Sequence, residues 1–186
     1  MATAPTITRT AIPTGTWTVD PVHSTVGFAV KHMGVATVRG EFREFEGTIE
    51  IGEGLESRVR GTVRAASVDT NQDQRDAHLR SEDFFDAESH TELSFESHRI
   101  EVLDDETLRI VGELTMNGVS NELELRAELV GAGLGAADEE RIGFEVTGQL
   151  SRRDYGMKFN AALGSGNAVV ADKVKLEIDI AAVKQD

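Results

Sequence analysis

The chain of 186 residues has no cysteine and only three prolines. Without cysteine there is no disulfide framework, so the fold depends on burial of apolar side chains and requires no oxidising compartment. Eighteen glycines supply many turn positions. With 39% hydrophobic and 28% charged residues, the composition is typical of a globular chain that builds one domain.

Positive charge is scarce, because 19 Lys and Arg stand against 33 Asp and Glu, giving a formal net charge of -14. Nucleic acids and anionic membrane surfaces attract clusters of Lys and Arg, so we expect neither as a partner. The opening MATAPTITRTAIPTG lacks the apolar run of a secretory signal or a membrane span. We expect a disordered tail over 1–15, one domain over 16–186, no stable membrane insertion, and a cytoplasmic rather than a periplasmic or secreted protein.

Apolar residues recur at every second position through most of the chain. In STVGFAVKH, for example, Val26, Phe28 and Val30 share one face, and His32 continues it. This alternation predicts strands with one buried and one wet face, which excludes a parallel sheet buried on both sides and favours an antiparallel sheet around one interior. About eight such strands close into a barrel. The alternating runs cover 16–20, 24–32, 41–51, 57–66, 92–102, 107–116, 121–130, 141–151 and 168–182.

The inward faces of these runs mix large apolar side chains with small ones. Small inward residues leave space for a ligand, although glycine in a strand also eases coiling and bulges, and both readings stay open. The large inward residues are Phe28, Phe45, Phe95, Leu114, Met116 and Phe144, and the small ones are Gly47, Gly61, Ala65, Gly112 and Gly148.

The segment 69–86, DTNQDQRDAHLRSEDFFD, breaks the alternation and predicts a short helix across one barrel end. Thr70 followed by Asp73 is a capping pattern, and Asp76 with Arg80 has the spacing of an ion pair. Ala77, Phe84 and Phe85 are expected to face the core. One side of this helix carries Arg75, His78, Leu79 and Glu82. That side is either a basic and apolar surface at the mouth of the barrel or a solvated face.

Two kinds of turn separate the runs. Asn117 and Gly118 lie between two alternating runs, which is a strong hairpin signal because both positions require positive φ. The glycine clusters at 131–140 and 164–167 predict flexible connections. Neither cluster has the residues of a phosphate-binding loop.

Catalytic and metal motifs are missing from the sequence. The five histidines include no HExxH motif and no pair at ligand spacing, and there is no nucleophile elbow. We therefore expect no catalysis, no cofactor and no metal. His32 shares the face of Phe28, where it could bond a ligand's quinone or phosphate oxygen, or a neighbouring strand.

Several uncommon blocks occur in a fixed order between Trp17 and about Val183. They are WTVDPVHSTVGFAVKHMGVATVRGEF, SVDTNQDQRDAHLRSEDFFD, FESH, VGELTMNGVSNELEL and LSRRDYGMKF. Together they resemble the signature blocks of the YceI-like, polyisoprenoid-binding family. The resemblance implies a lipocalin-like barrel whose pore holds a long isoprenoid chain, and a possible homodimer.

The resemblance also marks Arg75, Asp76, His78 and Leu79 in one block, and Arg152, Asp154, Tyr155 and Gly156 in another. If the inward phase of Leu150 continues, Arg152 and Asp154 reach the interior, where they form either a structural pair or a head-group anchor.

The sequence as a whole predicts an all-β, lipocalin-like antiparallel barrel of about eight strands, with a helical insert capping one end. Its expected function is non-catalytic binding, storage or transport of a polyisoprenoid or similar long-chain lipid, such as a prenyl quinone or prenyl phosphate. The alternatives are an enzyme acting on a lipid-like substrate in the same cavity, and a metal-binding protein. The expected pore-lining residues are Phe28, Val30, His32, Phe45, Phe84, Phe85, Phe95, Leu114, Met116, Phe144, Tyr155, Met157 and Phe159. The expected head-group or mouth residues are Arg75, Asp76, His78, Arg152 and Asp154.

Overall fold

The computed structural model describes residues 12–52, 56–161 and 169–186 of the chain. The segments in which apolar and polar residues alternate form antiparallel strands, as predicted, and the one α-helix within these described ranges lies in the insert. The strands are β1 (Gly15–Val19), β2 (Thr25–His32), β3 (Ala36–Phe42), β4 (Phe45–Ile51), β5 (Arg58–Arg64), β6 (Val68–Asp69), β7 (Glu92–Val102), β8 (Thr107–Met116), β9 (Val119–Leu134), β10 (Glu140–Ser151) and β11 (Val170–Lys184). The helices are α1 (Asp73–Arg80) and the short 3-10 turns η1 (Ala65–Ser67) and η2 (Arg152–Tyr155).

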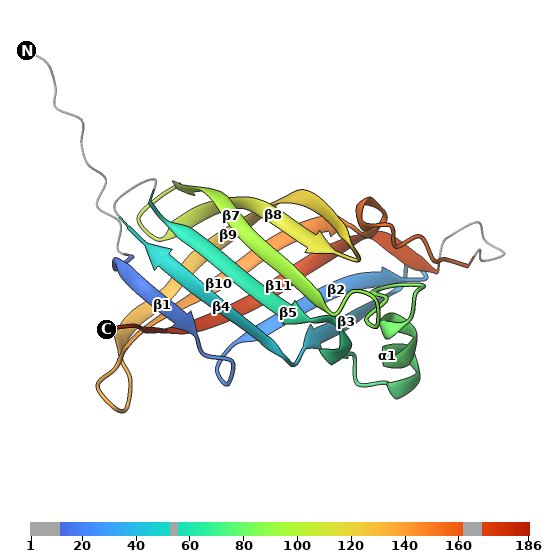
Figure 1. Ribbon diagram of the computed structural model, residues 1–186, viewed down its shortest axis with the longest axis horizontal. Coiled ribbons are helices and arrows are strands. Elements are labelled where there is room, and N and C mark those ends of the chain that lie inside the picture. Colours follow the sequence, from blue (N-terminus) through green and yellow to red (C-terminus); the bar gives the residue numbers. More distant parts are fainter. Residues whose placement is uncertain (1–11, 53–55, 162–168) are drawn as a thin grey trace, which may run out of the picture.

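Eight of these strands close into an antiparallel barrel in the order β1-β4-β5-β7-β8-β9-β10-β11, because β11 also pairs with β1. The closing register joins Trp17 to Lys184 and Val19 to Ala182. The barrel is elongated, with β1 and the C-terminus at one end and α1 at the other (Figure 1). The predicted fold class is confirmed.

The wall near α1 is extended by strands outside this ring. Residues 170–179 of β11 pair with β2, β2 pairs with β3, and β3 pairs with the short β6. The predicted run 41–51 is wrong in its bounds, since it joins the end of β3 to β4. The chain turns at Arg43 and Glu44, whose backbone N–H groups donate to the carbonyl and the hydroxyl of Ser67.

The hairpin between β8 and β9 has the predicted turn, with φ of 53° at Asn117 and 72° at Gly118. The flexible connection predicted over 131–140 is wrong in extent. Strand β9 continues to Leu134, which pairs with Glu140, because glycine does not interrupt a ladder that has a partner strand. The predicted loop at 164–167 lies outside the described residues.

Helix α1 begins differently from the prediction. Its N-cap is Gln72, whose side chain accepts a hydrogen bond from the Arg75 backbone N–H. The Thr70 hydroxyl and backbone N–H donate instead to the Asp76 carboxylate, at 2.5 and 2.8 Å. Asp76 is therefore buried against Thr70 and is not paired with Arg80. The prediction that Ala77 faces the core is also wrong, since this residue is exposed.

Buried apolar residues form two clusters inside the barrel. One lies toward the β1 end and includes Trp17 and Phe144, and the other lies toward α1 and includes Phe42 and Met116. Residues 1–11 of the expected tail are outside the described part of the chain, whereas Ile12 is only 4% exposed. Among the described residues, no helix has the length and apolar character needed to cross a bilayer.

Candidate ligand-binding cavity

The barrel encloses a cavity of about 1510 Å³. Its lining extends from Ile12 and Ile51 at the β1 end to Arg75 and Phe159 at the α1 end. Pockets for drug-sized ligands commonly measure about 300–1000 Å³, so this cavity is large enough for a longer molecule. Its length follows from the barrel, because most ring strands contribute inward residues along their whole extent.

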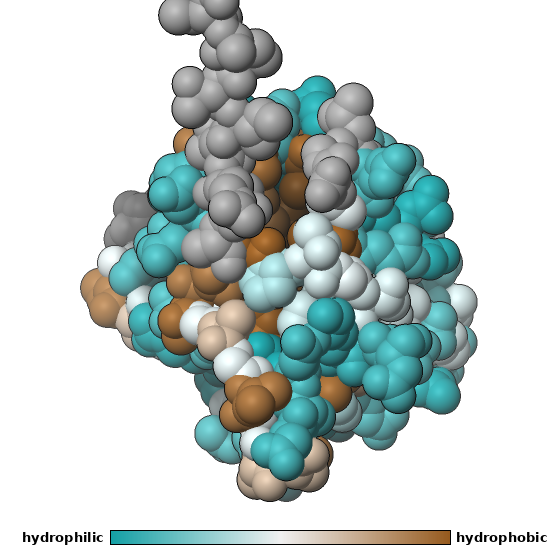
Figure 2. Space-filling view, turned by 90° about the vertical axis from the view of Figure 1, so that its left-hand side faces the viewer, coloured by the Kyte–Doolittle hydropathy of each residue, from teal (hydrophilic) through white to brown (hydrophobic). Residues whose placement is uncertain are grey.

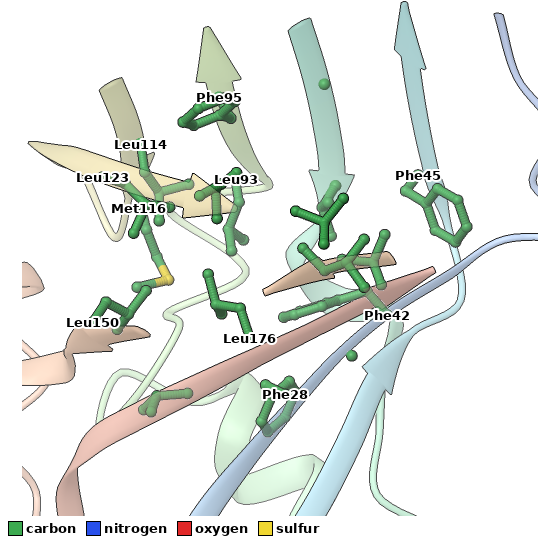
Figure 3. A pocket seen from close by; sticks show the side chains of 18 of the residues that line it. Phe28, Phe42, Phe45, Leu93, Phe95, Leu114, Met116, Leu123, Leu150 and Leu176 are labelled. Atoms are coloured by element: carbon green, nitrogen blue, oxygen red, sulfur yellow. The ribbon is translucent and has the colours of Figure 1, made fainter. Parts of the chain in front are cut away.

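The middle of the cavity wall is aliphatic and aromatic. Figure 3 shows Leu93, Met116, Leu150 and Leu176 projecting from β7, β8, β10 and β11 into the same space. Each has the inward phase that alternation assigns to its strand. A surface of this kind excludes water and recovers about 25 cal/mol per Å² when an apolar chain covers it.

Most residues predicted to line the pore do lie on this cavity, and the functional role of each stays a prediction. Those on the lining are Phe28, Val30, His32, Phe45, Phe84, Phe85, Phe95, Leu114, Met116, Phe144, Met157 and Phe159, together with Arg75, His78 and Arg152 from the predicted mouth.

Three predicted residues are not on the cavity lining. Tyr155 is 2% exposed within the α1-end cluster, where burial raises the pKa of its phenol. Asp76 is held by Thr70. Asp154 is exposed, and only its backbone carbonyl has a partner, the side chain of Asn121. The inward phase of Leu150 continues to Arg152 but not to Asp154, because Arg152–Tyr155 form a 3-10 turn with three residues per turn in place of a strand's two.

The inward glycines divide into two groups. Gly47 and Gly61 lie on the cavity lining. Gly112 and Gly148 do not, because neighbouring side chains fill their positions. A Cβ at Gly112 would lie 2.6 Å from Cζ of Phe95, and one at Gly148 would lie 2.7 Å from a methyl of Leu125. These two glycines serve packing. Ala65, fully buried, belongs to the α1-end cluster.

Arg152 is a buried cation at the α1 end of the cavity. It is 3% exposed, and its guanidinium donates to three backbone carbonyls: Ala171 at 2.9 Å, Met157 at 2.8 Å and Val170 at 3.2 Å. Burial lowers the pKa of this group. The predicted pair with Asp154 is wrong, and the side chain instead ties β11 to the segment that follows η2.

Arg75 and His78, the other basic side chains predicted at this mouth, also have partners. The Arg75 guanidinium donates to the Thr70 hydroxyl at 2.7 Å and to its carbonyl at 2.8 Å. His78 lies 2.8 Å from the Asp83 carboxylate, and its ring packs edge-on against Phe84 and Phe159, with centroids 5.1 and 4.6 Å apart. Three aromatic rings therefore cover this end between α1 and the segment after η2.

Comparison with known proteins identifies the family. The YceI-like domain family matches residues 17–182. The chain belongs to the YceI family. Among its relatives, the UPF0312 protein plu2095 of Photorhabdus laumondii is 37% identical over 76% of this chain and 73% of its own. The crystal structure of the YceI protein of Campylobacter jejuni is 29% identical, with a TM-score of 0.71 over 84% of this chain and 90% of that one.

A more distant structure has the same fold. A polyisoprenoid-binding domain from Saccharophagus degradans, implicated in plant cell wall breakdown, matches with a TM-score of 0.66 over 91% of this chain and 98% of that one. At 17% identity, it is a likeness of fold alone.

Sequence reasoning missed part of the wall of this YceI barrel. The lining also includes Leu123, Leu125, Val146 and Leu176, whose alternation is that of an inward strand face but does not separate a lining residue from an ordinary core residue. Ile12 carried no such signal, since it precedes the first strand. Within the described ranges, no group of three His, Asp or Glu side chains could hold a metal ion.

Proposed function

We propose that this protein binds one long apolar ligand, a polyisoprenoid or similar lipid, and releases it chemically unchanged. The observation that carries the proposal is the continuous apolar cavity of about 1510 Å³. Burying a flexible hydrocarbon chain along such a wall is favourable at every step of its length. Support also comes from the name of the Saccharophagus degradans domain, which has the same fold and is described as polyisoprenoid-binding.

Solvent extraction of the purified protein, followed by mass spectrometry, tests the proposal. We expect a prenyl or long-chain acyl lipid in the extract, and binding of added prenyl compounds after delipidation. A protein that yields no lipid and binds no added prenyl compound would overturn it. Recovery of a chemically altered ligand after incubation would favour the enzyme alternative.

A pair of neighbouring β11 variants localises the binding to the cavity. Leu176 lies on the cavity lining and Lys175 is exposed on the outer face. Leu176→Glu places a carboxylate on the apolar wall, where burial of an unpaired charge is costly, so prenyl binding should fall by about 100-fold or more. Lys175→Glu should bind as the parent does.

The polar end of the ligand is proposed to lie at the α1 mouth, near Arg75, His78 and Arg152. Arg75 is exposed and lies on the lining, whereas Arg80, on the same helix, does not. A charge-assisted hydrogen bond contributes about 1.5 to 3 kcal/mol. Arg75→Met should therefore weaken binding of a prenyl phosphate by about tenfold or more relative to the prenyl alcohol, and Arg80→Met should not. Equal effects on both ligands would refute the head-group assignment.

Entry is proposed to occur by movement of α1, since the closed ladders of the barrel cannot open without breaking many hydrogen bonds. The helix has few ties to the wall, mainly through Thr70 and the aromatic contacts of His78. Hydrogen exchange should therefore be faster over 73–87 than over β8 and β9, and slower there once ligand is bound. A ligand that leaves exchange in α1 unchanged argues against this gate.

A further inference from the structure

Ile12 lies at the barrel end opposite α1 (Figure 1). It precedes β1, is 4% exposed, packs in the same cluster as Trp17 and lies on the cavity lining. We call residues 12–14 the end plug. The lining at this end includes the apolar Ile51 and Val102, with the polar Thr14 and Ser57. Figure 2 views this end of the molecule and shows apolar residues gathered in its hollowed centre, within a mostly hydrophilic rim.

Gly15 directs the plug across the end of the barrel. Its φ of +138° is a conformation that side-chain-bearing residues rarely adopt, and a Cβ there would lie 2.9 Å from Cε of Lys184. Lys184 is fixed in turn by an ion pair with Glu140 at 2.5 Å. The glycine therefore turns the chain away from the line of β1 and carries Ile12 over the interior.

The plug is held by side-chain burial. Among the described residues, no hydrogen bond joins residues 12–14 to the barrel, and the pairing of β1 with β4 begins at Gly15, opposite Ile51. Part of the wall around the plug is also open to solvent, since Val102 is 47% exposed. Removing the Ile12 side chain therefore extends the cavity toward solvent at this end without breaking a ladder.

We propose that Ile12 sets the upper limit on the length of the hydrocarbon chain that the cavity accepts. The inference rests on the proposed function, with the polar end at α1 and the tail pointing toward β1. A chain that reaches Ile12 has no further room, so each additional carbon stays outside or forces the chain to fold back. A shorter side chain at position 12 lets the tail continue, and a longer one stops it earlier.

The test is a series of prenyl alcohols of increasing length, with affinity measured by displacement of a fluorescent prenyl probe. For the parent, affinity should rise with each added isoprene unit up to a limiting chain length and should not rise beyond it. Ile12→Ala should move that limit to longer chains, and Ile12→Phe to shorter ones. At the lengths next to the parent's limit, the two variants should differ by about tenfold or more, since burying two methylene groups changes affinity by about that factor.

Ile142→Ala is a matched control. Ile142 is the same residue type in the same cluster, is 2% exposed and is not on the cavity lining. The Ile142→Ala variant should be less stable than the parent and should have the same limiting chain length. If Ile12→Ala does not fold, Ile12→Phe still reports a shift toward shorter chains.

The possible outcomes separate the two proposals. A limit that neither variant moves, or an equal change at every length, makes Ile12 an ordinary wall residue and overturns the inference while the proposed function stands. A parent that binds no prenyl alcohol of any length overturns the proposed function and the inference with it.

Discussion

Replacing Arg152 by Met should destabilise the fold measurably. Three carbonyls in buried or partly buried positions lose the guanidinium as a donor, at about 1 kcal/mol each, although the Val170 carbonyl keeps a second donor in the Asn160 side chain; removal of a desolvated charge offsets part of this loss. The net loss should be about 2 to 3 kcal/mol. For a chain of 186 residues, that corresponds to a fall of about 4 to 12 °C in the melting temperature.

Thermal unfolding, monitored by circular dichroism, provides the measurement. Arg153→Met is the matched control. Arg153 is the next residue, its side chain is 61% exposed, and its Nε is 3.9 Å from the Asp172 carboxylate. Such a pair contributes less than about 1 kcal/mol, so this variant should melt within about 2 to 4 °C of the parent. An Arg152→Met protein that melts with the parent, or two variants with equal losses, would refute the role of Arg152 as a tie between segments.

The hydrogen bond from Arg141, at 2.9 Å, holds the pKa of the Asp20 carboxyl well below its usual range. The pair therefore stabilises the fold at pH values above the ordinary pKa of an aspartate, and this stabilisation is lost as the pH falls below it. Urea unfolding should show Asp20→Asn less stable than the parent by about 1 kcal/mol at pH 7, with a smaller difference below pH 4, and an equal difference at both would contradict this. Gly112→Ala places a Cβ 2.4 Å from the Glu96 carbonyl oxygen and should cost about 2 kcal/mol or more, whereas Gly131→Ala, with nothing within 4 Å, should unfold at nearly the parent's urea concentration.

The barrel could be predicted from the sequence because its cause is local and repeated. In each run, the alternation of apolar and polar residues predicts which face of the strand is buried. Many runs predict the same arrangement, with one face toward an interior and one toward solvent. Phe28 and Leu114 therefore could be placed on an interior without knowledge of their neighbours. The turn at Asn117 and Gly118 was predictable for a similar reason, since few residue pairs adopt that backbone.

The errors arose where the backbone leaves strand geometry. Asp154 was assigned to the interior by extending the period of β10 through η2, where that period no longer applies. Thr70 was interpreted as a helix cap, because sequence spacing does not reveal that the Asp76 carboxylate turns back to it. Ile12 precedes any periodic segment, and its burial depends on the change of chain direction at Gly15. One glycine in the sequence is not enough to predict that change. The homodimer and the cellular compartment stay predictions, which light scattering and cell fractionation would test.

The pairing of β1 with β11 has a consequence for how the protein acquires its fold. The closing ladder joins Trp17 to Lys184, so the pairing of β1 cannot be completed until β11 has been synthesised. Hairpins such as β8–β9 form early from neighbouring residues, but ring closure carries the entropy cost of a loop almost as long as the chain. During synthesis the apolar inner face stays accessible until the final strand leaves the ribosome. That interval, rather than the finished barrel, is when the chain is most exposed to aggregation.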